Sequence, residues 1–140
     1  MYILDTDSLS ILEHSGENAR RLLAKLSTLQ ADELSVTIIS YEEQMRGWLS
    51  YLARARSIQA QVEAYKRLKK QLENYCAISV IEFDEKSATE FQRLKKLYPR
   101  LGSMDLKIAA IAIANDAILL TRNLTDFGQI QELRAEDWTV

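Results

Sequence analysis

The chain has 140 residues, of which 47% are hydrophobic and 27% are charged, and its formal net charge is −2 at neutral pH. A single domain of this length can bury a hydrophobic core, and the net negative charge argues against binding nucleic acid by bulk electrostatics, since such domains are usually basic. The single cysteine, Cys76, and the single histidine, His14, exclude an internal disulfide and a thiolate zinc site, and they favour a reducing, cytoplasmic setting.

The first predicted elements are a strand, a helix and a second strand. A short apolar run over residues 2–4 predicts a buried strand, which a polar turn over residues 5–8 follows. This N-terminal segment does not have the pattern of a signal peptide, and no segment of the chain is long and apolar enough for a membrane span. Leucines at helical spacing predict a helix over residues 18–29, and a β-branched run predicts a strand over residues 34–39.

The middle of the chain predicts a long helical hairpin. Residues 40–43 (SYEE) have the form of a capping box, with a hydroxyl at the N-cap and a carboxylate three residues later. A helix is therefore expected to start there and to continue towards Ala55. A second, highly charged helix with one apolar stripe is expected over residues 57–75.

The last third of the chain alternates strands and helices. In chain order we expect a strand over 78–83, a helix over 84–97, an apolar helix over 105–114, a strand over 117–121 and an edge strand over 138–140. Such alternation implies right-handed crossovers and a parallel sheet that is covered on both faces. The predicted fold class is α/β, with one domain over residues 1–140 and a central, mainly parallel sheet of four or five strands flanked by helices.

Acidic residues lie near the carboxyl ends of the predicted strands, where sites form in open α/β sheets. Asp5 ends the first strand, Glu43 begins the helix after the second, and Asp105 opens the apolar helix. Asn123 and Asp126 follow the last main strand. Hard divalent cations such as Mg²⁺ bind carboxylate and water oxygens, and they activate water and stabilise charge at a phosphate. The pattern therefore indicates metal-dependent chemistry.

Each acid also has a purely structural explanation. Asp5 suits the cap of a turn, Glu43 is the N3 acid of the capping box, and Asp105 lies where the helix macrodipole favours negative charge. A single acid of this kind carries no functional weight, whereas several at strand ends favour a shared site.

Four blocks of the chain resemble those of PIN-domain proteins, in the order of that family. The blocks are residues 1–7, 36–47, 102–112 and 119–127, of which the third is the most specific. The acid four residues before Gly47 occupies the second acidic position, which selects Glu43 and not Glu42. Within the family the chain is most similar to the single-domain VapC-like toxins of prokaryotic toxin–antitoxin pairs.

The resemblance implies an endoribonuclease that depends on Mg²⁺ or Mn²⁺, forms a homodimer and is neutralised by a cognate antitoxin. It implies that Asp5, Glu43 and Asp105 hold the metal ion for attack of water on an RNA phosphodiester. The fourth acidic position departs from the pattern because it holds Asn123. That departure puts a second metal in doubt and makes Asp126 the nearby acid that could assist.

Other residues have two interpretations each. Thr121 is expected to hydrogen-bond a carboxylate or metal-bound water in the site. The alternative is that it is buried and hydrogen-bonds only backbone groups. Arg46, one helical turn beyond Glu43, is expected to contact phosphate or to pair with a carboxylate. An aromatic-rich patch near the hairpin suits core packing or an antitoxin groove; it comprises Trp48, Leu49, Tyr51 and Leu52. A basic cluster on the hairpin suits RNA contact or an ordinary solvated face; it comprises Arg54, Arg56, Lys66, Arg67, Lys69 and Lys70.

Three other functions compete with the ribonuclease. Asp5-Thr6-Asp7 after a strand resembles the start of haloacid-dehalogenase phosphatases, but Ser8-Leu9 follows where that family usually has Gly-Thr. A non-catalytic PIN-like module that binds RNA or a partner fits the Asn at position 123. A DNA-cutting nuclease of related fold also fits, since no element of the sequence reads a 2′-hydroxyl.

Overall fold

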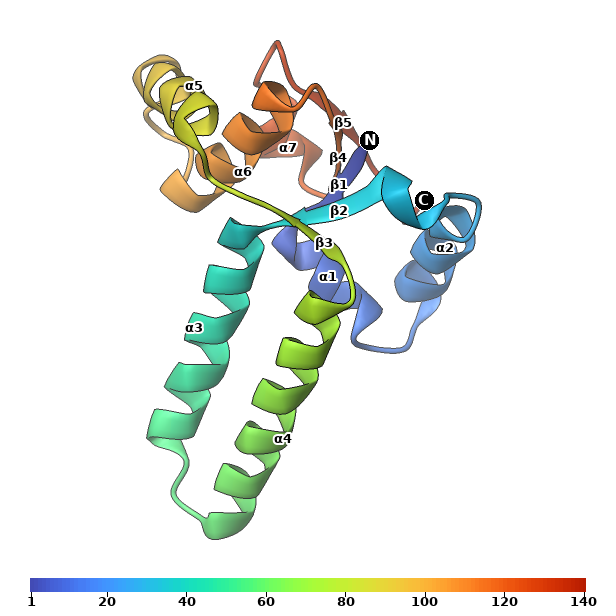
Figure 1. Ribbon diagram of the computed structural model, residues 1–140, viewed down its shortest axis with the longest axis vertical. Helices are drawn as coiled ribbons and strands as arrows, with labels where there is room; N and C mark the ends of the chain where they lie inside the picture. Colours follow the sequence, from blue (N-terminus) through green and yellow to red (C-terminus); the bar gives the residue numbers. More distant parts are fainter.

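Five strands form one parallel sheet in the order β3-β2-β1-β4-β5 (Figure 1). The computed structural model describes all 140 residues. The strands are β1 (Tyr2–Leu4), β2 (Leu34–Thr37), β3 (Ser79–Ile81), β4 (Ile118–Leu120) and β5 (Arg134–Glu136). Every neighbouring pair is parallel, which confirms the predicted α/β class. The central strand β1 is paired on both sides, with β2 and β4, so its carboxyl end lies in the middle of the sheet.

Seven α-helices and one 3-10 turn connect the strands. They are α1 (Thr6–Leu12), α2 (Glu17–Leu26), η1 (Ala31–Glu33), α3 (Ile38–Arg54), α4 (Ile58–Cys76), α5 (Glu85–Leu97), α6 (Ser103–Ala114) and α7 (Leu124–Phe127). Asp84 caps α5 by accepting a hydrogen bond from the Ser87 amide, and the helix over residues 84–97 is thereby confirmed. None of these helices is long and apolar enough to cross a membrane.

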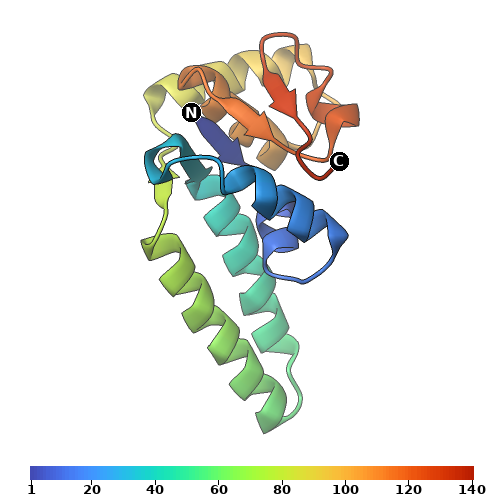
Figure 2. The ribbon, with the colours of Figure 1, turned by 90° about the vertical axis from the view of Figure 1, so that its right-hand side faces the viewer.

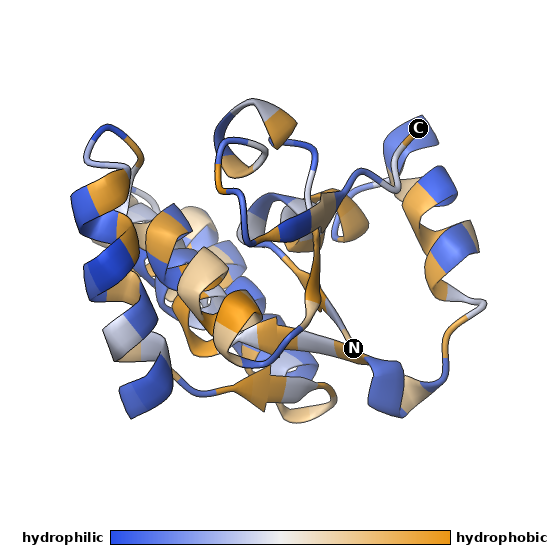
Figure 3. Cartoon of the chain, turned by 90° about the horizontal axis from the view of Figure 1, so that it is seen from above, coloured by the Kyte–Doolittle hydropathy of each residue, from blue (hydrophilic) through white to orange (hydrophobic).

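The sheet separates two apolar layers, because successive side chains of a strand point to opposite faces. Ile3 and Leu119 lie in the larger cluster, which includes most of α6, while Leu4 and Leu120 lie in the smaller cluster with leucines of α2. Figure 3 shows that the helices outside the sheet carry both hydrophobic and hydrophilic residues, as expected for helices with one buried face.

The predicted helical hairpin is confirmed: α3 and α4 pack side by side and extend away from the sheet (Figures 1 and 2). Several large apolar side chains along it are solvent-exposed, among them Leu49, Ile58 and Tyr65. The hairpin therefore presents a surface that the rest of the domain does not cover.

The start of α3 corrects the sequence prediction. The strand ends at Thr37, whose side chain accepts a hydrogen bond from the Ser40 amide and caps the helix. The predicted capping box over residues 40–43 is therefore wrong, because the turn that it would cap is already helical. Glu43 lies in the second turn of α3, so it is not needed for capping.

Two further predictions differ from the structure. Residues 5–8 do not form a turn, because α1 begins at Thr6 directly after the strand. The edge strand is β5 and not residues 138–140. Trp138 instead packs its ring against Tyr2, with ring centroids 4.8 Å apart. Propensity alone did not locate this strand, because its residues, Arg134 to Glu136, are poor strand formers.

Candidate active site

A cavity of about 610 Å³ opens at the carboxyl edge of the sheet, beyond β1, β2 and β4. We call it the acid cavity. Its lining residues are Asp5, Thr6, Asp7, Ser10, Glu43, Asp105, Arg122, Asn123 and Phe127. The cavity brings together the three acids that the sequence predicts as metal ligands, although they belong to segments far apart in the chain.

Asp5 is the most firmly held of these acids. Its backbone amide donates to the Leu120 carbonyl at 3.1 Å, and its Oδ1 accepts a hydrogen bond from the Ser8 amide at 2.8 Å. The residue is 4% exposed, and this burial raises the pKa of the carboxyl although hydrogen bonds from Thr121 and Ser8 lower it. Asp5 thus caps α1, as its structural explanation requires, and also lines the acid cavity.

Glu43 reaches the cavity from the second turn of α3. The Thr6 hydroxyl donates to Glu43 Oε1 at 2.6 Å, and Thr6 Oγ1 lies 2.9 Å from Ser40 Oγ. Because the single Thr6 proton goes to the carboxylate, the Ser40 hydroxyl is the donor to Thr6. Two hydroxyls therefore orient Glu43. The sequence analysis did not assign this role to Thr6, whose only signal in the sequence is its position next to Asp5.

Asp105 lies in the first turn of α6, whose N-cap residue, Gly102, offers no side-chain cap. Burial raises the pKa of the Asp105 carboxyl, and the negative charges of Glu43, Asp5 and Asp126 raise it further. These contributions mean that the carboxylates are close enough to repel one another.

Asn123 and Asp126 form a separate unit at the rim. Asn123 Oδ1 accepts from the Asp126 amide at 3.2 Å, and Asn123 Nδ2 donates to Asp126 Oδ2 at 3.0 Å. Asn123 therefore caps α7, and Asp126 does not line the acid cavity. Thr121 is buried outside the cavity lining; its hydroxyl accepts from the Asn123 amide at 2.9 Å, and its side chain lowers the pKa of the Asp5 carboxyl.

The donor set fits a hard cation. All candidate ligands are oxygens, and the histidine and the cysteine lie elsewhere, which suits Mg²⁺ or Mn²⁺ and not zinc. No three acidic, histidine or cysteine side chains lie close enough together to hold a metal ion by themselves. Magnesium usually takes only one or two protein carboxylates together with water and substrate phosphate, so an open arrangement of this kind is compatible with it.

The other charged residues that the sequence singled out lie outside the acid cavity. Arg46 is exposed and pairs with Glu42, whose carboxylate is 2.6 Å away. Arg67 pairs with Glu63 and stacks over the Trp48 ring, 5.6 Å from its centroid. No member of the basic cluster lines the cavity, and we therefore assign none of these side chains to it.

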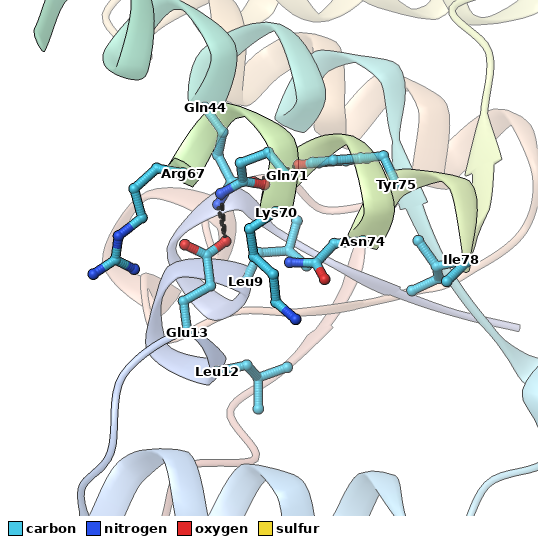
Figure 4. A pocket seen from close by; sticks show the side chains of 11 residues that line it. Leu9, Leu12, Glu13, Gln44, Arg67, Lys70, Gln71, Asn74, Tyr75 and Ile78 are labelled. Carbon is cyan, nitrogen blue, oxygen red and sulfur yellow. Dashed lines mark hydrogen bonds between the residues drawn. The ribbon is translucent and has the colours of Figure 1, made fainter. Parts of the chain in front are cut away.

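A second hollow, of about 460 Å³, lies between α1, α3 and α4 (Figure 4), and we call it the helix pocket. Its lining residues are Leu9, Leu12, Glu13, Gln44, Arg67, Lys70, Gln71, Asn74, Tyr75, Ala77 and Ile78. Glu13 Oε1 accepts from the side-chain amides of Gln44 at 3.1 Å and Gln71 at 2.8 Å, and the Tyr75 hydroxyl donates to Gln44 Oε1 at 2.6 Å. Only Gln71 Oε1 is buried without a partner.

Comparisons with known proteins agree with this geometry. The chain is 26% identical to Ribonuclease VapC1 of Haemophilus influenzae strain R2866, over 99% of this chain and 98% of that protein. Its fold is similar to that of VapBC-1 from nontypeable Haemophilus influenzae, with a TM-score of 0.71, 23% identity, and coverage of 99% and 98% of the two chains. It is also similar to FitAcB from Neisseria gonorrhoeae, with a TM-score of 0.75, 21% identity and the same coverage. The family model described as "PIN domain" matches residues 2–133, and the chain therefore belongs to the PIN domain family.

Proposed function

We propose that this protein is a metal-dependent endoribonuclease and the toxin of a toxin–antitoxin pair. The observation that carries the proposal is the acid cavity, in which Asp5, Glu43 and Asp105 meet at the carboxyl edge of the sheet. The curated relatives at 26% identity are named ribonucleases, and they match the chain over almost its full length.

We assign each residue a role towards a Mg²⁺ or Mn²⁺ ion. Asp5, Glu43 and Asp105 would hold the cation, which when bound lowers the pKa of water and stabilises negative charge at the phosphate. Thr6 keeps Glu43 turned into the cavity. Thr121 lowers the pKa of Asp5 and thereby favours its ionised form. Asn123 lies at the rim of the cavity, where its side chain caps α7 and hydrogen-bonds Asp126.

This arrangement supports attack by water on an RNA phosphodiester. Burial and mutual repulsion hinder ionisation of Asp5 and Asp105, so their ionised forms are favoured when a cation neutralises the cavity. Substrate RNA would bring its own phosphate oxygens as the remaining ligands. The one cysteine is free, which agrees with a protein that acts on RNA in the reducing cytoplasm.

We infer a cognate antitoxin as the protein partner, and a homodimer as the assembly. The structural neighbours are described as complexes of VapBC type, including one from Rickettsia felis bound to a promoter DNA fragment. The exposed apolar side chains of the α3–α4 hairpin offer a surface that a partner could bury. The mass of the purified protein by light scattering, alone and with its antitoxin, tests both inferences.

The decisive experiment compares wild-type protein with Asp105→Asn on a pool of structured cellular RNAs. Reactions contain Mg²⁺, Mn²⁺ or EDTA, and a DNA pool of matched length tests the DNA-nuclease alternative. Asp116→Asn is the matched control, because Asp116 is an exposed acid whose carboxylate pairs with Arg134 at the start of β5, away from the acid cavity. The proposal predicts RNA cleavage that requires the metal and Asp105 but not Asp116.

The other outcomes decide between the remaining functions. Metal binding by wild-type protein without cleavage of any RNA would favour the non-catalytic PIN-like module. Cleavage that is insensitive to EDTA, or equal cleavage by Asp105→Asn, would overturn the assignment of the carboxylates.

A further inference from the structure

The acid cavity contains one basic side chain, Arg122, and the proposed function gives it no role. Asp5, Asp7, Glu43 and Asp105 line the cavity with it, so the lining carries a formal net charge of −3 when all are ionised. A single divalent cation offsets only two of these charges. With the ion bound, the lining including Arg122 still carries a formal charge of −1, and Arg122 is its one side chain that attracts an incoming polyanion.

Arg122 is held in a fork geometry at the cavity mouth. Its Nε donates to Asp7 Oδ2 at 2.9 Å, and its Nη2 donates to Asp7 Oδ1 at 3.1 Å. This is the bidentate arrangement with which arginine binds carboxylates and phosphates alike. The guanidinium is thus oriented for bidentate binding of a phosphate group, and the carboxylate of Asp7 occupies the place that such a phosphate would take.

The backbone on both sides of Arg122 is fixed. The amide of Thr121 donates to the Glu136 carbonyl at 2.9 Å, and the amide of Asn123 donates to Thr121 Oγ1 at 2.9 Å. The side chain of Asn123 then caps α7. Arg122 therefore projects from a rigid loop, so only its side chain has to move when a ligand enters.

A purely structural role for the ion pair explains less. Arg122 and Asp7 are 40% and 50% exposed, and exposed pairs of this kind add little to stability. The segments that they join are already connected by hydrogen bonds from the Asp5 amide and the Ser8 hydroxyl to the Leu120 carbonyl. The pair is therefore expected to contribute little to the stability of the fold.

We propose that Arg122 binds a backbone phosphate of the RNA strand in the acid cavity, and that Asp7 holds its guanidinium until the phosphate takes the place of the carboxylate. The proposal rests on the proposed function in that RNA is the ligand. Arg122 is then a substrate-binding residue, and Asp7 is a positioning residue that competes with the phosphate.

The test measures RNA binding separately from cleavage. The parent protein is Asp105→Asn with Mg²⁺ present, the probe is a fluorescein-labelled, mixed-sequence single-stranded RNA, and fluorescence anisotropy gives Kd over a range of NaCl concentrations. Arg122→Gln, Arg122→Lys and Asp7→Asn are added to this parent. Arg134→Gln is the matched control, because Arg134 also pairs with an exposed aspartate, Asp116. Arg134 is the first residue of β5, so it lies at the amino ends of the strands, whereas the acid cavity lies at their carboxyl ends.

Arg122→Gln should weaken binding severalfold and reduce the slope of log Kd against log[NaCl] by about one, the signature of one lost phosphate contact. Arg122→Lys should keep the slope while losing part of the affinity, because lysine retains the charge but not the fork. Asp7→Asn should tighten binding, since it removes the competing carboxylate. A merely structural ion pair would make Arg122→Gln and Asp7→Asn behave alike.

Equal Kd and slope for Arg122→Gln and Arg134→Gln would overturn the proposal, and so would a parent protein that binds no RNA. Failure of the proposed function is recognised independently, by wild-type protein that binds RNA through Arg122 but does not cut it. Circular dichroism of each variant checks that the fold is intact.

Discussion

The acid cavity and the helix pocket are both hollows lined by buried polar groups, yet their chemistry is opposite. In the helix pocket, Glu13 accepts from two amides and Gln44 accepts from Tyr75, so its buried side-chain polar atoms are paired except for Gln71 Oε1. In the acid cavity, burial and neighbouring acids raise the pKa of Asp5 and Asp105. A satisfied polar network stabilises a fold, whereas carboxylates with raised pKa values indicate a site that a ligand completes.

Two adjacent residues of α3 connect the regions, because Glu43 lines the acid cavity and Gln44 lines the helix pocket. The comparison predicts that mutations in the cavity change metal binding and catalysis, and that mutations in the pocket change stability. Four experiments test this division, from the largest expected effect to the smallest.

The largest effect is expected from Asp5→Asn, which should reduce RNA cleavage by at least about 100-fold, because metal-ion catalysis supplies several kcal/mol. Its unfolding free energy in EDTA should not fall, since Asn is as good an N-cap as Asp. Asp5→Ala should lose cleavage equally and in addition lose about 0.5–2 kcal/mol of stability with the cap. Cleavage assays and urea unfolding measure the two effects; an Asp5→Asn protein with wild-type cleavage would remove Asp5 from the site.

Metal ions should stabilise the wild-type protein through the acid cavity. A cation at 100 times its Kd should add about 2.7 kcal/mol to the unfolding free energy, because it binds the folded state. The measurement is urea unfolding with Mg²⁺ or Mn²⁺ against EDTA, with Asp105→Asn as the comparison. Equal stabilisation of both proteins would show that the ion binds elsewhere.

The helix pocket is tested by Tyr75→Phe, which removes the donor to Gln44 Oε1. Burial raises the pKa of the Tyr75 hydroxyl, so it remains a protonated donor at neutral pH. Leaving a buried acceptor unpaired should cost about 1–3 kcal/mol. Tyr65→Phe is the control, because Tyr65 is 59% exposed, and metal affinity should be unchanged in both variants. Loss of metal binding in Tyr75→Phe would show that the two regions are not separate.

The smallest effect is a dependence of stability on pH in EDTA. The folded-state pKa of Asp105 is raised above its ordinary value of 3.8, so the ionised carboxyl destabilises the fold at neutral pH. This penalty disappears as the pH falls through the raised pKa towards 3.8, because the folded state then binds the proton first. Asp105→Asn should therefore be more stable than wild type at pH 7, and the difference should shrink on acidification. A difference that is independent of pH, measured by urea unfolding, would contradict this assignment.

Much of this division could be predicted from the sequence. The spacing of apolar residues located the buried strands and the α3–α4 hairpin, and the position of Asp5, Glu43 and Asp105 near strand ends predicted a shared cavity. Local patterns failed where a tertiary contact decides the structure. The motif over residues 40–43 satisfies every rule for a helix start, yet the Thr37 hydroxyl caps the helix earlier.

The contacts that sequence reasoning missed are long-range. The hydroxyl of Thr6 reaches Glu43 across 37 positions, and the guanidinium of Arg122 reaches Asp7 across 115. No periodicity or spacing rule reports such pairs, because they arise only when β1, β2 and β4 lie side by side. The same holds for the helix pocket, whose network joins α1, α3 and α4.

The neighbouring positions of Glu43 and Gln44 fix the helical phase of α3. Successive residues of an α-helix are rotated by about 100° around its axis. Deleting one residue between the Thr37 cap and Glu43 would bring Gln44 to the acid cavity and Met45 towards the helix pocket, so one loss would disable two regions. Between Thr37 and Gln44, the positions of α3 that line neither region should therefore tolerate substitution better than a change in the length of the helix.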